Sequence, residues 1–137
     1  MSGVLVDTSL LVLVFRDRTQ GNAERLIAEI GDQDIVLSRI VAAELLAGAK
    51  DEAEWMRIEG FVLSKTVLEV DASAWTEAAR LYFDARRGGK TIRKLADCCI
   101  AHLAISHGVT LLHNDRDFET IATFRPLKQI RFDLSKA

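Results

Sequence analysis

Four short apolar segments, each followed by a stretch with helical spacing, constrain the fold more than any other feature of the sequence. They lie at residues 4–6, 35–37, 66–70 and 109–112. Strands that are apolar on both faces belong in a parallel sheet that is covered on both sides. The alternation of these strands with helices also indicates a parallel sheet, so we expect an α/β protein with a three-layer α/β/α fold. The central, mostly parallel sheet should have four to five short strands, the fifth from residues 127–132.

Apolar spacing and capping residues predict the helices between these strands. We expect helices at residues 10–15, 23–30, 39–47, 55–62, 75–87, 95–107 and 117–122. Thr8 or Ser9 should cap the first of them, and Asp71 or Ser73 the long helix that ends before Gly88. The apolar stripe of that long helix is expected to comprise Trp75, Ala78, Ala79, Tyr82 and Phe83.

Length and composition indicate one folded domain over residues 1–137. The chain has 49% hydrophobic and 28% charged residues, enough to bury a core. The sequence contains no run of about 18 apolar residues, so no membrane span is predicted. The N-terminus lacks the positively charged stretch that is typical of a signal peptide. Cys98 and Cys99 are adjacent, with neither a metal-binding nor a disulfide spacing. We therefore expect a cytoplasmic protein in which both thiols are reduced and buried.

Acidic residues stand at positions where a charge is costly. Asp7 is the only charge in residues 4–15, Glu44 in 40–49 and Asp97 in 95–105, and Asp115 and Asp117 follow the fourth strand. Burying an unpaired carboxylate costs several kcal/mol, so buried charges are usually paired or bind metal. Each acid alone could instead be a helix cap or one half of an ion pair. Neither explanation fits Glu44, because it lies in the middle of an apolar helix.

A shared cation explains these acids together. Ligand side chains with oxygen donors only select hard cations, which favours Mg²⁺ or Mn²⁺ over zinc. In a parallel sheet the ligand site lies beyond the carboxyl ends of the strands, where Asp7 and Asp115 are expected. Carboxylates that hold one or two such ions are suited to the hydrolysis of phosphodiesters.

The segments around these acids resemble the four acidic motifs of the PIN domain, and of the VapC toxins in particular. They read Val-Asp7-Thr-Ser, Ala-Glu44-Leu-Leu-Ala-Gly, Leu-Ala-Asp97-Cys-Cys-Ile-Ala and Leu-Leu-His-Asn-Asp115-Arg-Asp117-Phe. Each motif alone is weak, but the ordered set runs over almost the whole chain.

The resemblance implies a Mg²⁺- or Mn²⁺-dependent endoribonuclease that is the toxin of a toxin–antitoxin pair. Asp7, Glu44, Asp97 and Asp115 or Asp117 would form the catalytic metal site, and Thr8, Ser9 and Asn114 would support it through hydrogen bonds. The implied partners are an RNA substrate and a VapB-like antitoxin. The implied assembly is a homodimer or a hetero-oligomer with that antitoxin.

Basic residues cluster just before the segment that contains Asp97. The net charge is −2, so the chain has no general basic field. Locally, Arg86, Arg93 and Lys94 could hold RNA phosphates beside the acids, together with Arg87 and Lys90. Alternatively, Arg86 and Arg87 simply offset the charge at a helix C-terminus.

Other signals favour neither a histidine-based site nor another enzyme class. His102, His107 and His113 have no metal-binding spacing. A haloacid dehalogenase phosphatase needs a second aspartate two residues after the first, where this chain has Ser9. A receiver domain needs an acidic pair after the first strand and a lysine after the fourth. A non-catalytic binding module with the same fold is the remaining alternative.

Overall fold

The computed structural model describes residues 3–134, which form a five-stranded sheet with seven helices. The strands are β1 (Gly3–Val6), β2 (Asp34–Ser38), β3 (Thr66–Leu68), β4 (Thr110–His113) and β5 (Gln129–Arg131). The helices are α1 (Thr8–Arg16), α2 (Gly21–Ile30), α3 (Arg39–Ala47), α4 (Glu52–Leu63), α5 (Ala72–Arg87), α6 (Leu95–His107) and α7 (Arg116–Ala122).

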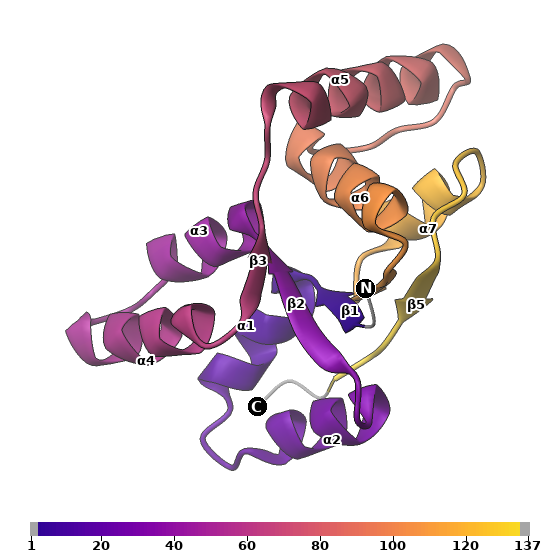
Figure 1. Ribbon diagram of the computed structural model, residues 1–137. Coiled ribbons are helices and arrows are strands. Elements are labelled where there is room, and N and C mark those ends of the chain that lie inside the picture. The colour runs from indigo at the N-terminus through magenta and orange to yellow at the C-terminus, as the bar shows by residue number, and fades with distance from the viewer. Residues whose placement is uncertain (1–2, 135–137) are drawn as a thin grey trace.

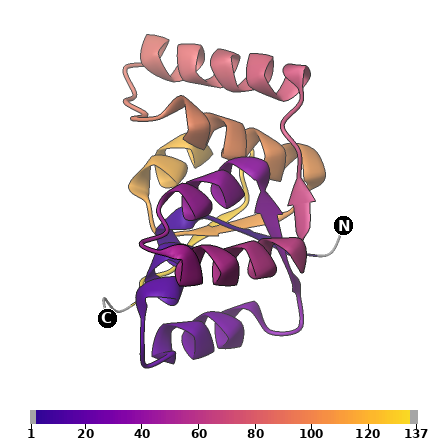
Figure 2. The ribbon, with the colours of Figure 1, turned by 90° about the vertical axis from the view of Figure 1, so that its left-hand side faces the viewer.

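The strands lie in the order β3-β2-β1-β4-β5, and every neighbouring pair is parallel. Helix α1 contacts α2 and α3, and α3 contacts α4, whereas α6 contacts α5 and α7. In both views of the ribbon the sheet lies between α2 and the pair α5 and α6 (Figures 1 and 2). The reversal of strand order at β1 explains these two groups, since right-handed crossovers to opposite sides of β1 place their helices on opposite faces. The predicted three-layer α/β/α fold is confirmed.

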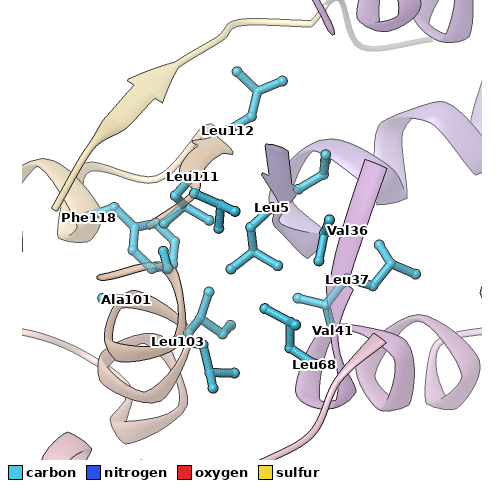
Figure 3. Packing of buried hydrophobic residues seen from close by; sticks show 14 of the residues in the cluster. Leu5, Val36, Leu37, Val41, Leu68, Ala101, Leu103, Leu111, Leu112 and Phe118 are labelled. Atoms are coloured by element: carbon cyan, nitrogen blue, oxygen red, sulfur yellow. The ribbon is translucent and has the colours of Figure 1, made fainter. Parts of the chain in front are cut away.

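The core is built around β1, the central strand. Leu5 is fully buried, and Figure 3 shows it between Val36 of β2 and Leu111 of β4. Leu103 of α6 and Phe118 of α7 complete this cluster on the β4 side. Strands with buried residues on both faces leave polar side chains room only where a strand ends, which is where the acidic residues lie.

Two expectations, one about a helix cap and one about the end of a strand, were wrong in detail. Helix α1 is capped by Asp7, whose carboxylate accepts a hydrogen bond from the Ser9 backbone N–H at 3.0 Å, and not by Thr8 or Ser9. Strand β3 ends at Leu68, short of the predicted Val70. Of the two candidates for the cap of α5, the structure has Asp71.

The buried face of α5 also differs from the expectation. It consists of Ala74, Ala78, Leu81 and Ala85, whereas Trp75 and Phe83 are 44% and 37% exposed. Both sets have helical spacing, but α5 packs along α6 (Figure 1), and small side chains let two helices approach closely. The aromatic residues are therefore left on the outer side of α5.

Both cysteines behave as buried apolar side chains. Cys98 and Cys99 are free and fully enclosed in α6. Burial raises the pKa of the Cys98 thiol to about 12 and that of Cys99 to about 11, so both stay protonated. Among residues 3–134, no helix combines the length and the apolar character that a membrane crossing requires.

The central position of Leu5 gives a first prediction. Leu5→Ala should lower the free energy of unfolding by about 2–5 kcal/mol, because it removes buried contacts and leaves a cavity. Leu63, at the end of α4, is 80% exposed, so Leu63→Ala should change stability by less than about 0.5 kcal/mol. Urea unfolding of the two variants checks this, and equal losses would contradict the central place of β1 in the core.

Candidate active site

The carboxyl ends of β1 and β4 bring together the first acids of the site. These two strands are hydrogen-bonded neighbours, with Val6 opposite Leu112. Asp7 follows β1 directly, and its backbone N–H donates to the Leu112 carbonyl at 3.0 Å. Asp115 lies two residues beyond β4, where it caps α7. Parallel pairing thus places the two residues at the same edge of the sheet although more than 100 residues separate them.

Asp97 enters from the first turn of α6. This helix precedes β4, so it runs back across the sheet and begins near the carboxyl ends of the strands. Within residues 3–134, Asp97, Asp115 and Asp117 form a group in which one carboxylate oxygen from each lies within 4.8 Å of the others. Asp7 lies close enough for its charge to act on Asp97. Four of the five sequence-predicted acids therefore meet at one place.

Asp97 lies in an electrostatically unfavourable environment. The residue is 7% exposed, and its Oδ2 atom is buried without a hydrogen-bond partner. Burial, followed by the charges of Asp7 and Asp115, raises the pKa of the Asp97 carboxyl to about 7, although the nearby Lys94 ammonium opposes the shift. Burial also raises the pKa of Asp7, against the hydrogen bonds from Ser9 that lower it. Such carboxylates are costly to keep ionised unless a cation joins them.

Arg93 offsets part of this negative charge. Its guanidinium donates to Asp115 Oδ1 at 2.7 Å and to Asp117 Oδ2 at 3.0 Å. Its backbone N–H also donates to Asp117 Oδ2, at 3.1 Å. Both carboxylates raise the pKa of Arg93, so the guanidinium stays charged. The predicted role of Arg93 was RNA binding alone, and this ion pair could not be predicted because it depends on the path of the chain between α5 and α6.

The predicted supporting residues link the elements that surround the acids. The Thr8 hydroxyl donates to Glu44 Oε1 at 2.8 Å, which joins α1 to α3. Ser9 Oγ accepts from the Asn114 backbone N–H at 2.9 Å, which joins α1 to the segment after β4. Glu44 is half-buried at the edge of a small cavity that Thr8 and Arg16 also line, and it lies outside the three-carboxylate group.

His113 is a positioning residue, a role that was not predicted from the sequence. It is fully buried at the end of β4, and its Nδ1 accepts a hydrogen bond from the Asp115 backbone N–H at 3.0 Å. The opposite ring nitrogen, Nε2, therefore carries the proton and donates to Gln129 Oε1 of β5 at 2.6 Å. The imidazole thus fixes the backbone of Asp115. The only sequence signal was a histidine two residues before an aspartate at a strand end.

The other predicted substrate-binding residues are Lys94 and Arg86, of which only Lys94 acts on an acid of the site. Lys94 is exposed just before the first turn of α6, and its charge acts on Asp97. Arg86 is in the last turn of α5, where its guanidinium lies over the Tyr82 ring at 5.8 Å from the centroid. Arg86 therefore has both the helix C-terminus and an aromatic neighbour to stabilise it.

The residues present fit a hard divalent cation. The converging donors are carboxylate oxygens, which Mg²⁺ and Mn²⁺ prefer. The unpartnered Asp97 Oδ2 is available as a ligand atom, and its raised pKa reflects a surplus of negative charge that a cation would remove. Asp7 and Asp115 do cap helices, as the simpler explanation allowed, but Asp97 has no such explanation.

The comparison with protein families is decisive. The sequence profile of the PIN domain matches residues 4–123. Ribonuclease VapC11 of Mycobacterium tuberculosis is 38% identical over 133 residues, which cover 94% of this chain and 98% of that protein. This chain belongs to the PIN-domain family and, within it, to the VapC ribonucleases.

Solved structures agree with the family at the level of the fold. VapBC from Salmonella typhimurium, bound to DNA, superposes with a TM-score of 0.72 at 24% identity, over 96% of this chain and 98% of that chain. Mycobacterium tuberculosis VapC20, described as a sarcin–ricin loop cleaving toxin, has a TM-score of 0.69 at 22% identity, over 92% and 99% of the two chains.

The raised pKa of Asp97 gives a prediction on stability in EDTA. The folded protein keeps the Asp97 proton up to about pH 7, whereas the unfolded chain releases it near 3.8. Asp97 therefore lowers the free energy of unfolding as the pH rises from about 4 to about 7. Asp97→Asn should match wild type near pH 4 and exceed it by a few kcal/mol near pH 7, which is of the order expected for a shift of this size.

Urea unfolding of both proteins at a series of pH values measures this difference. A structural hydrogen-bonding role for Asp97 predicts the opposite result, with the variant less stable than wild type at every pH. That outcome would remove Asp97 from the group of mutually repelling carboxylates.

Proposed function

We propose that this protein is a metal-dependent endoribonuclease and the toxin of a toxin–antitoxin pair. It would hydrolyse phosphodiester bonds in RNA at the acidic group between β1, α6 and α7. The observation that supports this most strongly is the buried Asp97 Oδ2, which has no hydrogen-bond partner and faces three further aspartates. A fold that retains so costly an arrangement uses it for binding a cation.

Asp7, Asp97, Asp115 and Asp117 are the residues that would hold Mg²⁺ or Mn²⁺. When bound, such an ion activates a water molecule, orients the phosphate and stabilises charge on the leaving oxygen. Asp97 can hold a proton at neutral pH in the absence of the cation and gives it up as a ligand. His113 and Arg93 keep Asp115 in place, from its backbone and its carboxylate respectively.

Glu44 would act from α3, outside the three-carboxylate group. Its Oε1 atom accepts from the Thr8 hydroxyl, which fixes the carboxylate at the edge of α1 without neutralising it. Its second oxygen is then available to orient water or an RNA hydroxyl. Thr8, Ser9 and Asn114 would contribute by holding α1, α3 and the segment after β4 in register.

Lys94, Arg93 and Arg86 would hold the RNA. Lys94 is exposed beside Asp97, where an ammonium can accept a phosphate that the acids alone would repel. Arg93 keeps more than half of its side chain accessible despite its two ion pairs. A local basic rim beside an acidic centre is sufficient for RNA binding without a basic net charge.

The partner that fits this function is a VapB-like antitoxin. A surplus of buried negative charge favours an arginine of the antitoxin in the acidic site, since a guanidinium can pair with two carboxylates at once. We further propose that the whole chain is one PIN domain and that it acts in the cytoplasm, as a homodimer or in a hetero-oligomer with the antitoxin.

Cleavage of single-stranded RNA tests the proposed function. With Mn²⁺ or Mg²⁺ the protein should cut RNA internally, and EDTA should stop the reaction. Asp97→Asn and Asp7→Asn should each lower the rate by about a hundredfold or more, because each removes a ligand charge. Gel analysis of end-labelled RNA gives the rates.

The matched control is Glu119→Gln, which removes the same charge from an exposed residue of α7 that pairs with Arg131. It should cut RNA at nearly the wild-type rate. Cleavage that persists in EDTA, or that Asp97→Asn leaves intact, would refute the metal-dependent mechanism.

A further inference from the structure

A second polar site lies beside the acidic group, where α5 ends and the chain turns toward α6. It is a surface cavity of about 200 Å³, lined by Tyr82, Arg86, Lys90, Thr91 and Ile92. Ile92 is buried beneath it, whereas Tyr82 and Lys90 are half-buried and Arg86 is exposed. The cavity thus has an aromatic ring and two cationic groups in its wall above an apolar floor.

The charges of this cavity are not neutralised by carboxylates. Arg86 lies over the Tyr82 ring, and the Lys90 ammonium lies 5.9 Å from the centroid of Phe124. Within residues 3–134, neither Arg86 nor Lys90 takes part in an ion pair. Aromatic faces hold the two cations in position but leave their charge available to an anion.

Two neighbouring cations, by contrast, are paired with a carboxylate. Arg80 and Arg125 both bind Asp84, at 3.1 and 2.6 Å. Arg80 and Arg87 lie over Phe83, at 5.1 and 5.6 Å from its centroid, and neither lines the cavity. Of the basic residues of α5, Arg86 therefore lines the cavity on the side of Tyr82, whereas Arg80 and Arg87 lie around Phe83.

The same short connection carries this cavity and part of the acidic group. Arg93 is three positions after Lys90, so their Cα atoms are at most about 11 Å apart. Arg93 binds Asp117 through its backbone and its guanidinium. A chain that passes over the acids can therefore reach the cavity within one or two nucleotides.

We propose that this cavity binds a nucleotide of the RNA substrate next to the phosphodiester bond that is cleaved. The base lies against Tyr82, and its phosphate lies between Arg86 and Lys90. Single-stranded RNA is recognised by aromatic rings that stack on bases and by cations that contact phosphates, and both occur here. This assignment rests on the proposed ribonuclease function and adds a subsite that positions the RNA.

Binding of a fluorescein-labelled, single-stranded RNA pentamer, followed by anisotropy in EDTA, tests the proposal without cleavage. The double variant Arg86→Ala/Lys90→Ala should bind about tenfold more weakly and lower the salt slope by about one. Tyr82→Leu should weaken binding by a similar factor, because it removes stacking, but should leave the salt slope unchanged. Melting curves confirm that each variant is folded.

The matched control is Lys65→Ala/Arg80→Ala, which also removes one lysine and one arginine that lie over aromatic rings, Phe61 and Phe83, but that do not line this cavity. It should weaken binding by less than about threefold. Equal weakening by the two double variants would mean that the basic surface acts diffusely and would overturn the proposal. Normal binding by Tyr82→Leu would overturn the stacking of a base.

Cleavage in Mn²⁺ separates this proposal from the proposed function. A raised KM for the Arg86→Ala/Lys90→Ala variant, with kcat nearly unchanged, supports a binding subsite. If wild type cuts RNA and this variant has the same KM, the subsite is refuted while the ribonuclease function stands. If wild type cuts no RNA, the ribonuclease function fails, and with it the placement of the cavity beside a cleaved bond.

Discussion

Repulsion among carboxylates at the carboxyl ends of β1 and β4 is the interaction on which the rest of the site depends. Asp97 is buried against Asp7, Asp115 and Asp117, and burial together with their charges raises its pKa to about 7. Arg93 offsets only two of these acids, and its charge is shared between them. This surplus of negative charge explains the affinity for a cation that we propose. The surrounding hydrogen bonds prevent the acids from moving apart in response to it.

The fold provides that restraint through its backbone. Asp7 caps helix α1 and Asp115 caps helix α7, so each carboxylate accepts a hydrogen bond from a backbone N–H of the helix it caps. Capping lowers the cost of the negative charge, because the first turn of a helix carries positive partial charge. His113 and Ser9 fix the segment between β4 and α7 from two sides. The acids are thus placed by a rigid sheet and not by flexible loops, as precise geometry at a reaction centre requires.

Much of the fold and the positions of the acids could be predicted because both depend on local patterns. Apolar strands, helix stops such as Gly108 and charges inside apolar segments are visible in the sequence. The Arg93 ion pairs and the His113–Gln129 hydrogen bond could not be predicted, since they join residues brought together only by the fold. The same is true of the alanine face of α5, because packing against α6 decides which of two helical stripes is buried. The RNA contacts assigned to Arg86, Arg93 and Lys94 stay predictions.

Direct measurement of Mn²⁺ binding tests the central claim that the acidic group is a metal site. The electron paramagnetic resonance signal of free Mn²⁺ reports binding in the absence of RNA and of cleavage. Wild type and Glu119→Gln should bind the ion with equal affinity, and Asp97→Asn should bind at least about tenfold more weakly. If wild type binds no Mn²⁺, or if Asp97→Asn binds it as tightly as Glu119→Gln, the acidic group is not the metal site described here.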